Sequence, residues 1–114
     1  YRAGTSVTTG ASNVIIGKDA AQSMTEGHSS VFVGENAGNS ITTGNSLVFV
    51  GKSAGDGHDT ETHNVGVGRD ALGGAIAGGE YNVAVGSYTL DALTSADNCG
   101  FRLWCWHCYN YWCF

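Results

Sequence analysis

A five-residue pattern of alternating apolar positions recurs along the chain and ends in glycine each time. The copies begin at Asn13, Ser30, Leu47, Asn64 and Asn82. Their two alternating residues and closing glycines are Val14, Ile16, Gly17; Val31, Val33, Gly34; Val48, Val50, Gly51; Val65, Val67, Gly68; and Val83, Val85, Gly86. The closing glycines are 17, 17, 17 and 18 residues apart. We interpret the copies as structural repeats, each carrying one short β-strand.

A repeat of this length fits one coil of a parallel β-solenoid, in which each strand lies over the next at about 4.8 Å. The glycines are expected at corners, where the backbone needs a positive φ or a close approach. The sequence therefore predicts an all-β, short-coil solenoid of about six 17-residue coils over residues 1–101. The fourth coil departs from the pattern because His58 takes the usual apolar position. We expect a looser, solvated turn there.

The predicted strands are apolar on both faces. The alternating valines and Ile16 share one face by the two-residue period, and Ile15, Phe32 and Phe49 share the other. A strand that is apolar on both faces needs cover on both. A 17-residue coil encloses only one of them, so the simplest cover for the other is a second copy of the chain. We expect Ile15, Phe32 and Phe49 at an interface between copies. The alternative is a lone solenoid that leaves the two phenylalanines exposed.

The motif Val-Gly-x-x-Ala, a spacer and Thr-Thr-Gly-x-x-Asn-Val-x-Val-Gly resembles the repeats of bacteriophage tail fibres and related bacterial surface proteins. It is more loosely similar to the head repeats of trimeric autotransporter adhesins, which carry a Ser-Val-Ala-Ile-Gly core. The resemblance covers residue 1 to about residue 101. It implies a homotrimeric β-roll or β-helix that forms a shaft or head and serves host attachment, in a virion tail fibre or on a bacterial surface. It supplies no catalytic or ligand-binding position.

Residues 102–114 break the pattern, with all three tryptophans and three of the four cysteines. Cys105-Trp106-His107-Cys108 resembles a metal or redox pair, but four ligands are needed for structural zinc and no second pair is evident. An aromatic membrane or interface patch is the second interpretation. The third is a reading-frame error caused by one extra base near Phe101, because removing that base turns each tryptophan codon into a glycine codon and restores Thr-Thr-Gly. We favour the frameshifted tail.

Composition excludes several classes of protein. Charged residues make up 13% of the 114 residues, against about 25% in average proteins, which argues against a coiled coil or a disordered polyelectrolyte. The net charge is −5 and the five Lys and Arg are scattered, which argues against nucleic-acid binding. No apolar run approaches the ~20 residues of a membrane span, so we expect no membrane insertion. The chain begins at Tyr1 without a signal-peptide pattern, and we interpret it as a fragment.

Candidate chemistry is sparse. No nucleophile elbow or phosphate loop occurs, so we expect no enzyme activity and no cofactor. The weak candidates for a metal site are Asp56, His58, Asp59, Glu61 and His63, for which a solvated acidic turn is the simpler interpretation. Thr8-Thr9 and Thr42-Thr43 suggest an ice-binding ladder, but a flat ladder needs threonine in every coil, and the matching positions of other coils hold Thr25-Glu26, Asp59-Thr60 and Ala77-Gly78.

These patterns predict a structural attachment module whose main partner is itself, with a cell-surface glycan or receptor as a further partner. The alternative is a glycan- or ice-binding solenoid that uses exposed turns such as residues 55–63.

Overall fold

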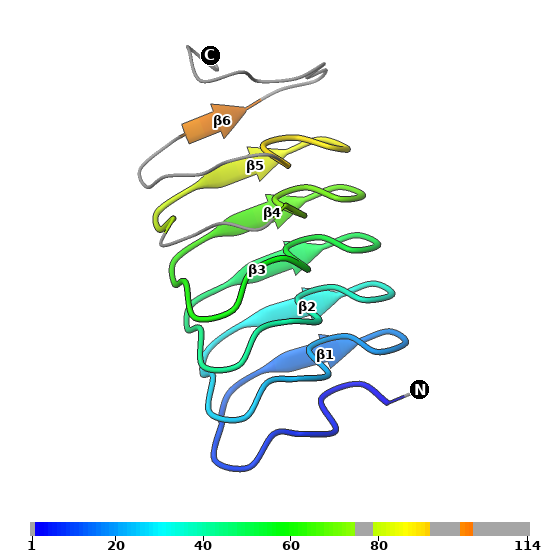
Figure 1. Ribbon diagram of the computed structural model, residues 1–114, viewed down its shortest axis with the longest axis vertical. Helices are drawn as coiled ribbons and strands as arrows, with labels where there is room; N and C mark the ends of the chain where they lie inside the picture. Colours follow the sequence, from blue (N-terminus) through cyan, green and yellow to red (C-terminus); the bar gives the residue numbers. More distant parts are fainter. Residues whose placement is uncertain (1, 75–78, 92–98, 102–114) are drawn as a thin grey trace.

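The chain forms an all-β, parallel β-solenoid (Figure 1). The computed structural model describes residues 2–74, 79–91 and 99–101. Its strands are β1 (Val14–Ile16), β2 (Val31–Val33), β3 (Val48–Val50), β4 (Val65–Val67), β5 (Val83–Val85) and β6 (Cys99–Phe101). They form one sheet in chain order, and every adjacent pair is parallel. The predicted all-β, parallel β-solenoid and the predicted positions of β1 to β5 are therefore confirmed.

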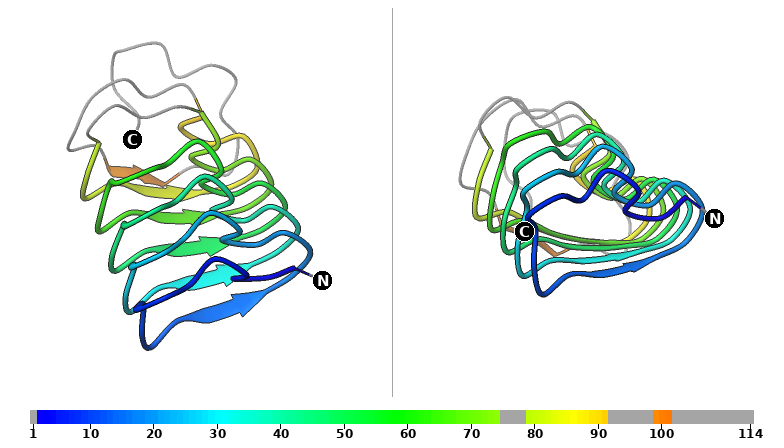
Figure 2. Two further views of the ribbon diagram at one scale, coloured as in Figure 1. Left: turned by 60° about the horizontal axis from the view of Figure 1, so that its bottom comes forward. Right: turned by 90° about the horizontal axis from the view of Figure 1, so that it is seen from below.

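Successive coils superpose in register, so that the strands lie along one side of the stack (Figure 2). Val14 pairs with Val31 and Val31 with Val48, while Phe32 pairs with Phe49 in the neighbouring row. The backbone of each coil also bonds to the next outside the strands; for example, the Thr8 N–H donates to the Thr25 carbonyl and the Thr25 N–H to the Thr42 carbonyl, both at 2.9 Å. The stack is thus held by backbone hydrogen bonds between residues 15 to 19 positions apart, at the strands and in the segments that connect them.

The closing glycines are required by both conformation and space. Gly17, Gly34, Gly51, Gly68 and Gly86 have φ between 124° and 136°. A Cβ added at Gly34 would lie 2.5 Å from the carbonyl oxygen of Gly51, its counterpart on the next coil. Any side chain would therefore force two coils apart, which explains why the sequence repeats glycine at this corner.

The two strand faces are assigned opposite to the sequence-based expectation. Phe32 and Phe49 are fully buried inside the coil, whereas Val14 and Ile16 are 47% and 58% exposed. The rings of Phe32 and Phe49 lie on adjacent coils with centroids 5.9 Å apart and their planes tilted by 44°. Ile15 packs against the same core. The prediction that Ile15, Phe32 and Phe49 form an interface between copies is therefore wrong, because these side chains fill the chain's own interior.

The middle residue of each strand and a residue of the corner that follows it share one interior space. A large residue at one of the two positions is matched by a small residue at the other, and we call this the size exchange. Phe32 faces Gly38, where an added Cβ would lie 2.5 Å from the ring. At β4 the strand residue is Gly66, and the side chain of Leu72, in the corner that leads into the next coil, fills the space instead. Each strand and the corner that follows it thus provide one large group. This keeps the coils equally wide although the strand residue varies from phenylalanine to glycine.

The interpretations made for residues 102–114 lie outside the described residues. The metal, aromatic-patch and frameshift hypotheses therefore stay predictions, as does the boundary at residue 101.

Candidate functional site

The outward face of the sheet carries two straight columns of apolar side chains. The first and third residues of each strand point outward because the second points into the coil. The columns contain Val14, Val31, Val48, Val65 and Val83, and Ile16, Val33, Val50, Val67 and Val85. We call these ten residues the valine face. From β1 to β5 it extends for about 19 Å at the spacing of paired strands.

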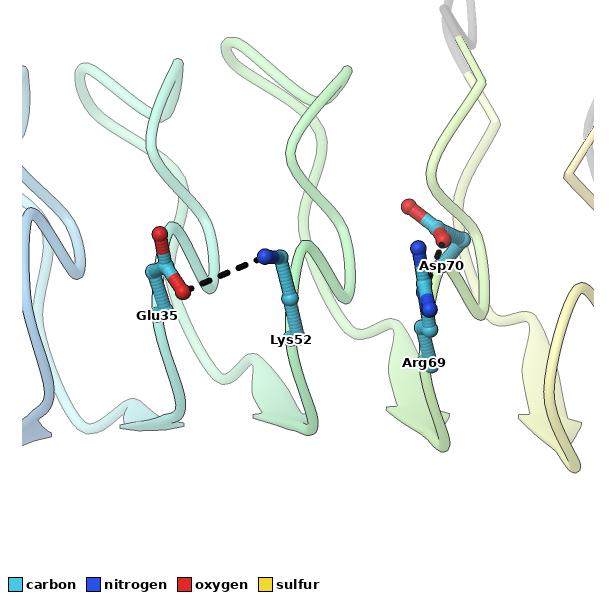
Figure 3. Close-up of polar contacts among 4 residues, drawn as sticks. All are labelled: Glu35, Lys52, Arg69 and Asp70. Atoms are coloured by element: carbon cyan, nitrogen blue, oxygen red, sulfur yellow. Dashed lines mark hydrogen bonds and ion pairs between the residues drawn. The ribbon is translucent and has the colours of Figure 1, made fainter.

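Polar side chains border the valine face on the side where the strands end. Glu35 and Lys52 occupy equivalent positions on successive coils, directly after the closing glycines, and form an ion pair of 3.2 Å (Figure 3). Arg69 takes the same position on the next coil, pairs with Asp70 at 3.2 Å and lies over the Tyr88 ring. These charges are thus neutralised within the chain, while the face beside them contains only aliphatic groups.

Exposed side chains border the other side of the valine face. Ser12, Ser29, Ser46, His63 and Tyr81 form a column of left-handed corner residues with φ between 55° and 61°. The His63 and Tyr81 rings stack in parallel with centroids 5.0 Å apart, and Tyr81 is 63% exposed. This pair presents a flat aromatic surface beside the start of β5.

The threonine column uses its hydroxyl protons inside the chain. The Thr8 hydroxyl donates to the Thr25 carbonyl at 3.1 Å, and the Thr25 hydroxyl donates to the Thr42 carbonyl at 3.2 Å. The Thr42 hydroxyl donates to a carboxylate oxygen of Asp59 at 2.6 Å. These donors bind the coils to one another, so the column offers few free donors to ice or to a glycan.

The hydroxyl of Ser30 is also used within the stack. It donates to the His28 carbonyl at 3.0 Å and accepts the Leu47 N–H at 3.1 Å. The Nδ1 atom of His28 accepts the Ala11 N–H at 3.0 Å and therefore carries no proton in this arrangement. The neighbouring serine and histidine thus bond to backbone groups of other residues.

The weak metal candidates of the fourth coil do not converge. His58 is fully buried and Glu61 is 7% exposed, whereas Asp59 and His63 lie on the surface. Glu61 accepts the Asp59 N–H at 2.8 Å, and Nδ1 of His63 lies 2.9 Å from the Thr62 hydroxyl. Within the described ranges, no three His, Cys, Asp or Glu side chains are grouped so as to hold a metal ion. The expected solvated turn is wrong for His58, which keeps the interior position of its column.

Burial shifts the pKa of two side chains in this coil. Removal from water lowers the pKa of His58 to about 4, although the Glu61 carboxylate and the Leu72 backbone favour the charged ring. Burial and the nearby Asp70 charge raise the pKa of Asp56, against hydrogen bonds from Ser53 and its own backbone. His58 is therefore neutral at pH 7.

The sequence located the valine columns but gave no direct sign of which face is inside. The size exchange carried that information, because glycine follows the strand phenylalanines by six residues while leucine follows Gly66 and Ala84 by six. Only residues that share one enclosed space need such compensation.

In the described part of the chain, no helix is long and apolar enough to cross a membrane. Comparisons of the chain with protein-family models, with curated proteins and with solved structures found no match.

Proposed function

We propose that this chain is a structural, non-enzymatic module of a homotrimeric fibre that serves attachment, as part of a phage tail fibre or a bacterial surface adhesin. The observation that carries the proposal is the uninterrupted valine face, repeated in register on successive coils. We expect about six coils in all, and no contact with nucleic acid or insertion into a membrane.

An aliphatic face of this kind favours self-association. Two columns of β-branched side chains remain at the surface of a single chain, and their burial contributes roughly 25 cal/mol for each Å² removed from water. The face gains one strand with every coil, so the area that two copies bury grows with the length of the stack. A cyclic arrangement covers the same face on every copy. The trimer is the state implied by the resemblance to fibre and adhesin repeats.

The regular stack suits a structural role. Each coil contacts mainly its two neighbours, and equivalent backbone hydrogen bonds join successive coils. Such a module determines length and spacing, and it presents terminal or exposed segments to a receptor.

The experiment compares one substitution on the valine face with one beside it. Val48→Asp places a charge in the middle of the face, and Ser46→Asp places the same charge at an exposed corner of the same coil. We expect a trimer by sedimentation for the parent chain and for Ser46→Asp. We expect a folded monomer for Val48→Asp, because the carboxylate cannot be buried between copies.

A substitution at an internal phenylalanine serves as a control that unfolds the chain instead of only separating the copies. Phe32→Asp buries a charge inside a single chain, so we expect loss of the β-sheet circular dichroism signal and not merely dissociation. A parent chain that stays monomeric and soluble at micromolar concentration would contradict the proposed assembly. So would a Val48→Asp variant with the mass of the parent.

A second candidate function is glycan binding, with ice binding as its less supported form. The observation that favours it is the exposed aromatic pair of His63 and Tyr81, since aromatic faces with polar borders suit amphipathic ligands. Replacing residues 55–63 with the matching residues of the preceding coil removes His63. A glycan-binding module then loses affinity on a glycan array, whereas a purely structural module retains its mass and shows no specific ligand before or after the change.

A further inference from the structure

Two residues of the fourth coil replace the residue types of their columns. His58 follows Met24 and Ile41 in an apolar interior column, and Glu61 follows Gly27 and Gly44 in a glycine column. Both side chains lie inside: His58 is fully buried and Glu61 is 7% exposed. The one repeat of 18 residues follows directly, between Gly68 and Gly86. Three irregular features of the repeat thus follow one another along the stack.

His58 has an apolar and poorly compensated environment. Its ring meets the Phe49 ring edge-on, with centroids 4.9 Å apart. Neither ring nitrogen has a hydrogen-bonding partner in good geometry. A buried polar group without a partner costs stability even when it is neutral, and a buried charge costs considerably more.

The groups that face His58 cannot easily compensate a second proton on its ring. Among the described residues, the charged side chain whose field reaches the ring is Glu61, and the backbone of Leu72 faces it from the following coil. Glu61 already accepts the Asp59 N–H at 2.8 Å. Asp56 and Asp70 repel each other nearby. By sequence, residues 75–78 contain no ionisable side chain.

We propose that His58 makes the fourth coil an acid-sensitive break point: uptake of a proton by the buried ring opens the coil between Phe49 and Leu72, while the preceding coils stay closed. Local opening is possible because each coil depends mainly on its neighbours, so the stack need not unfold as one unit. This regulatory property is independent of the proposed attachment function and holds for a monomer or a trimer.

The size of the effect follows from the protonation of the ring. A pKa of about 4 in the folded coil and 6.5 in the open coil means that protons bind preferentially to the open form between these values. The opening equilibrium of this coil then rises on the order of 100-fold from pH 7.5 to pH 4.5.

The test measures hydrogen exchange of the full chain at pH 7.5 and pH 4.5, corrected for the intrinsic exchange rates. We expect the excess exchange at pH 4.5 in residues 55–64, while β1 and β2 keep their protection. His58→Ile copies the residue of the preceding coil and His58→Met copies Met24, so at least one isosteric apolar variant is expected to fold. Each removes the excess exchange. His63→Gln removes an exposed histidine of the same coil and is expected to retain the excess exchange of the parent chain.

Three results would overturn the proposal. One is an equal response to acid in the parent chain and both His58 variants. Another is exchange that begins in the first coils and reaches the fourth last. The third is a parent chain that keeps full protection at pH 4.5, with Glu61→Gln losing it, since the protonated ring would then be stabilised by Glu61. The mass of the assembly is measured at both pH values, which separates dissociation of copies from opening of the coil.

Discussion

The size exchange inside the coil predicts a strong coupling between Phe32 and Gly38. Gly38 has a φ of 59°, and a Cβ added there would lie 2.5 Å from two carbon atoms of the Phe32 ring. Gly38→Ala therefore has two costs. The left-handed backbone costs about 1 kcal/mol for a residue with a Cβ, and the overlap with the ring costs about 2 kcal/mol as overpacking of a closed interior. We expect a loss of about 3 kcal/mol in the free energy of unfolding.

A double-mutant cycle separates these two costs. Phe32→Ala alone removes a fully buried ring and is expected to cost about 4 kcal/mol. Once the ring is absent, Gly38→Ala retains only its backbone cost of about 1 kcal/mol, so the coupling energy is about 2 kcal/mol. Asn36→Ala is the matched control, since Asn36 also has a φ of 59° but already carries a side chain. It is expected to lose under about 1 kcal/mol.

The assay is urea denaturation followed by circular dichroism, at one protein concentration for all variants because self-association shifts apparent stability. If Phe32→Ala leaves too little folded protein, Phe32→Leu completes the cycle with a smaller cavity. Free energies that add within about 0.5 kcal/mol would show that the two residues do not share one space, and the size-exchange explanation would be wrong.

Three further predictions concern other parts of the chain. Asn64→Ala is expected to lower the free energy of unfolding by about 2–4 kcal/mol, because the buried amide donates to a carbonyl of the next coil at 2.7 Å and accepts the Asn82 N–H at 2.9 Å. The control is Asn45→Ala, at a half-exposed position, which is expected to cost about 1 kcal/mol in the same urea titration. The free energy of unfolding of the parent chain is expected to be highest above pH 6.5 and to fall as the pH drops from 6.5 to about 4. The lowered pKa of His58 accounts for about 3 kcal/mol of this fall, and a parallel curve for His58→Ile would contradict the assignment. Sequencing the gene near codon 101 is expected to reveal one extra base, and its removal is expected to add a coil and raise the denaturation midpoint. If the purified chain instead contains stoichiometric zinc that is lost in the double variant Cys105→Ser, Cys108→Ser, the metal interpretation is supported.

The sequence alone determined the solenoid and its register. A period of 17 residues with a closing glycine and alternating apolar residues has few solutions, because each coil must stack its like residues on those of the next. All five predicted strands are present at their predicted positions, and Gly34 adopts the corner that its spacing indicated. Such local features repeat five times, and the repetition makes a weak motif specific.

Only the tertiary structure decided which strand face lies inside. The period of two residues separates the faces but does not name them, and here both faces are apolar, so hydrophobicity gives no contrast between Val31 and Phe32. In the closed coil, the limited volume of the interior determines which strand face lies inside. One face must fit an enclosed space of fixed width, which Phe32 with Gly38 and Gly66 with Leu72 fill equally, while the other face meets no such limit.

The constraint imposed by the stacked coils also explains why the sequence-based expectation for His58 was wrong. A polar residue in a polar segment predicts a solvated turn, but the stack positions each residue by its place in the coil and not by its own preference. The column that holds Met24 and Ile41 carries His58 inside at its next step, because the hydrogen bonds of the coils on either side determine where the backbone runs. Burial of this ring is therefore a property of the assembled stack, and it appears only when the neighbouring coils are in place.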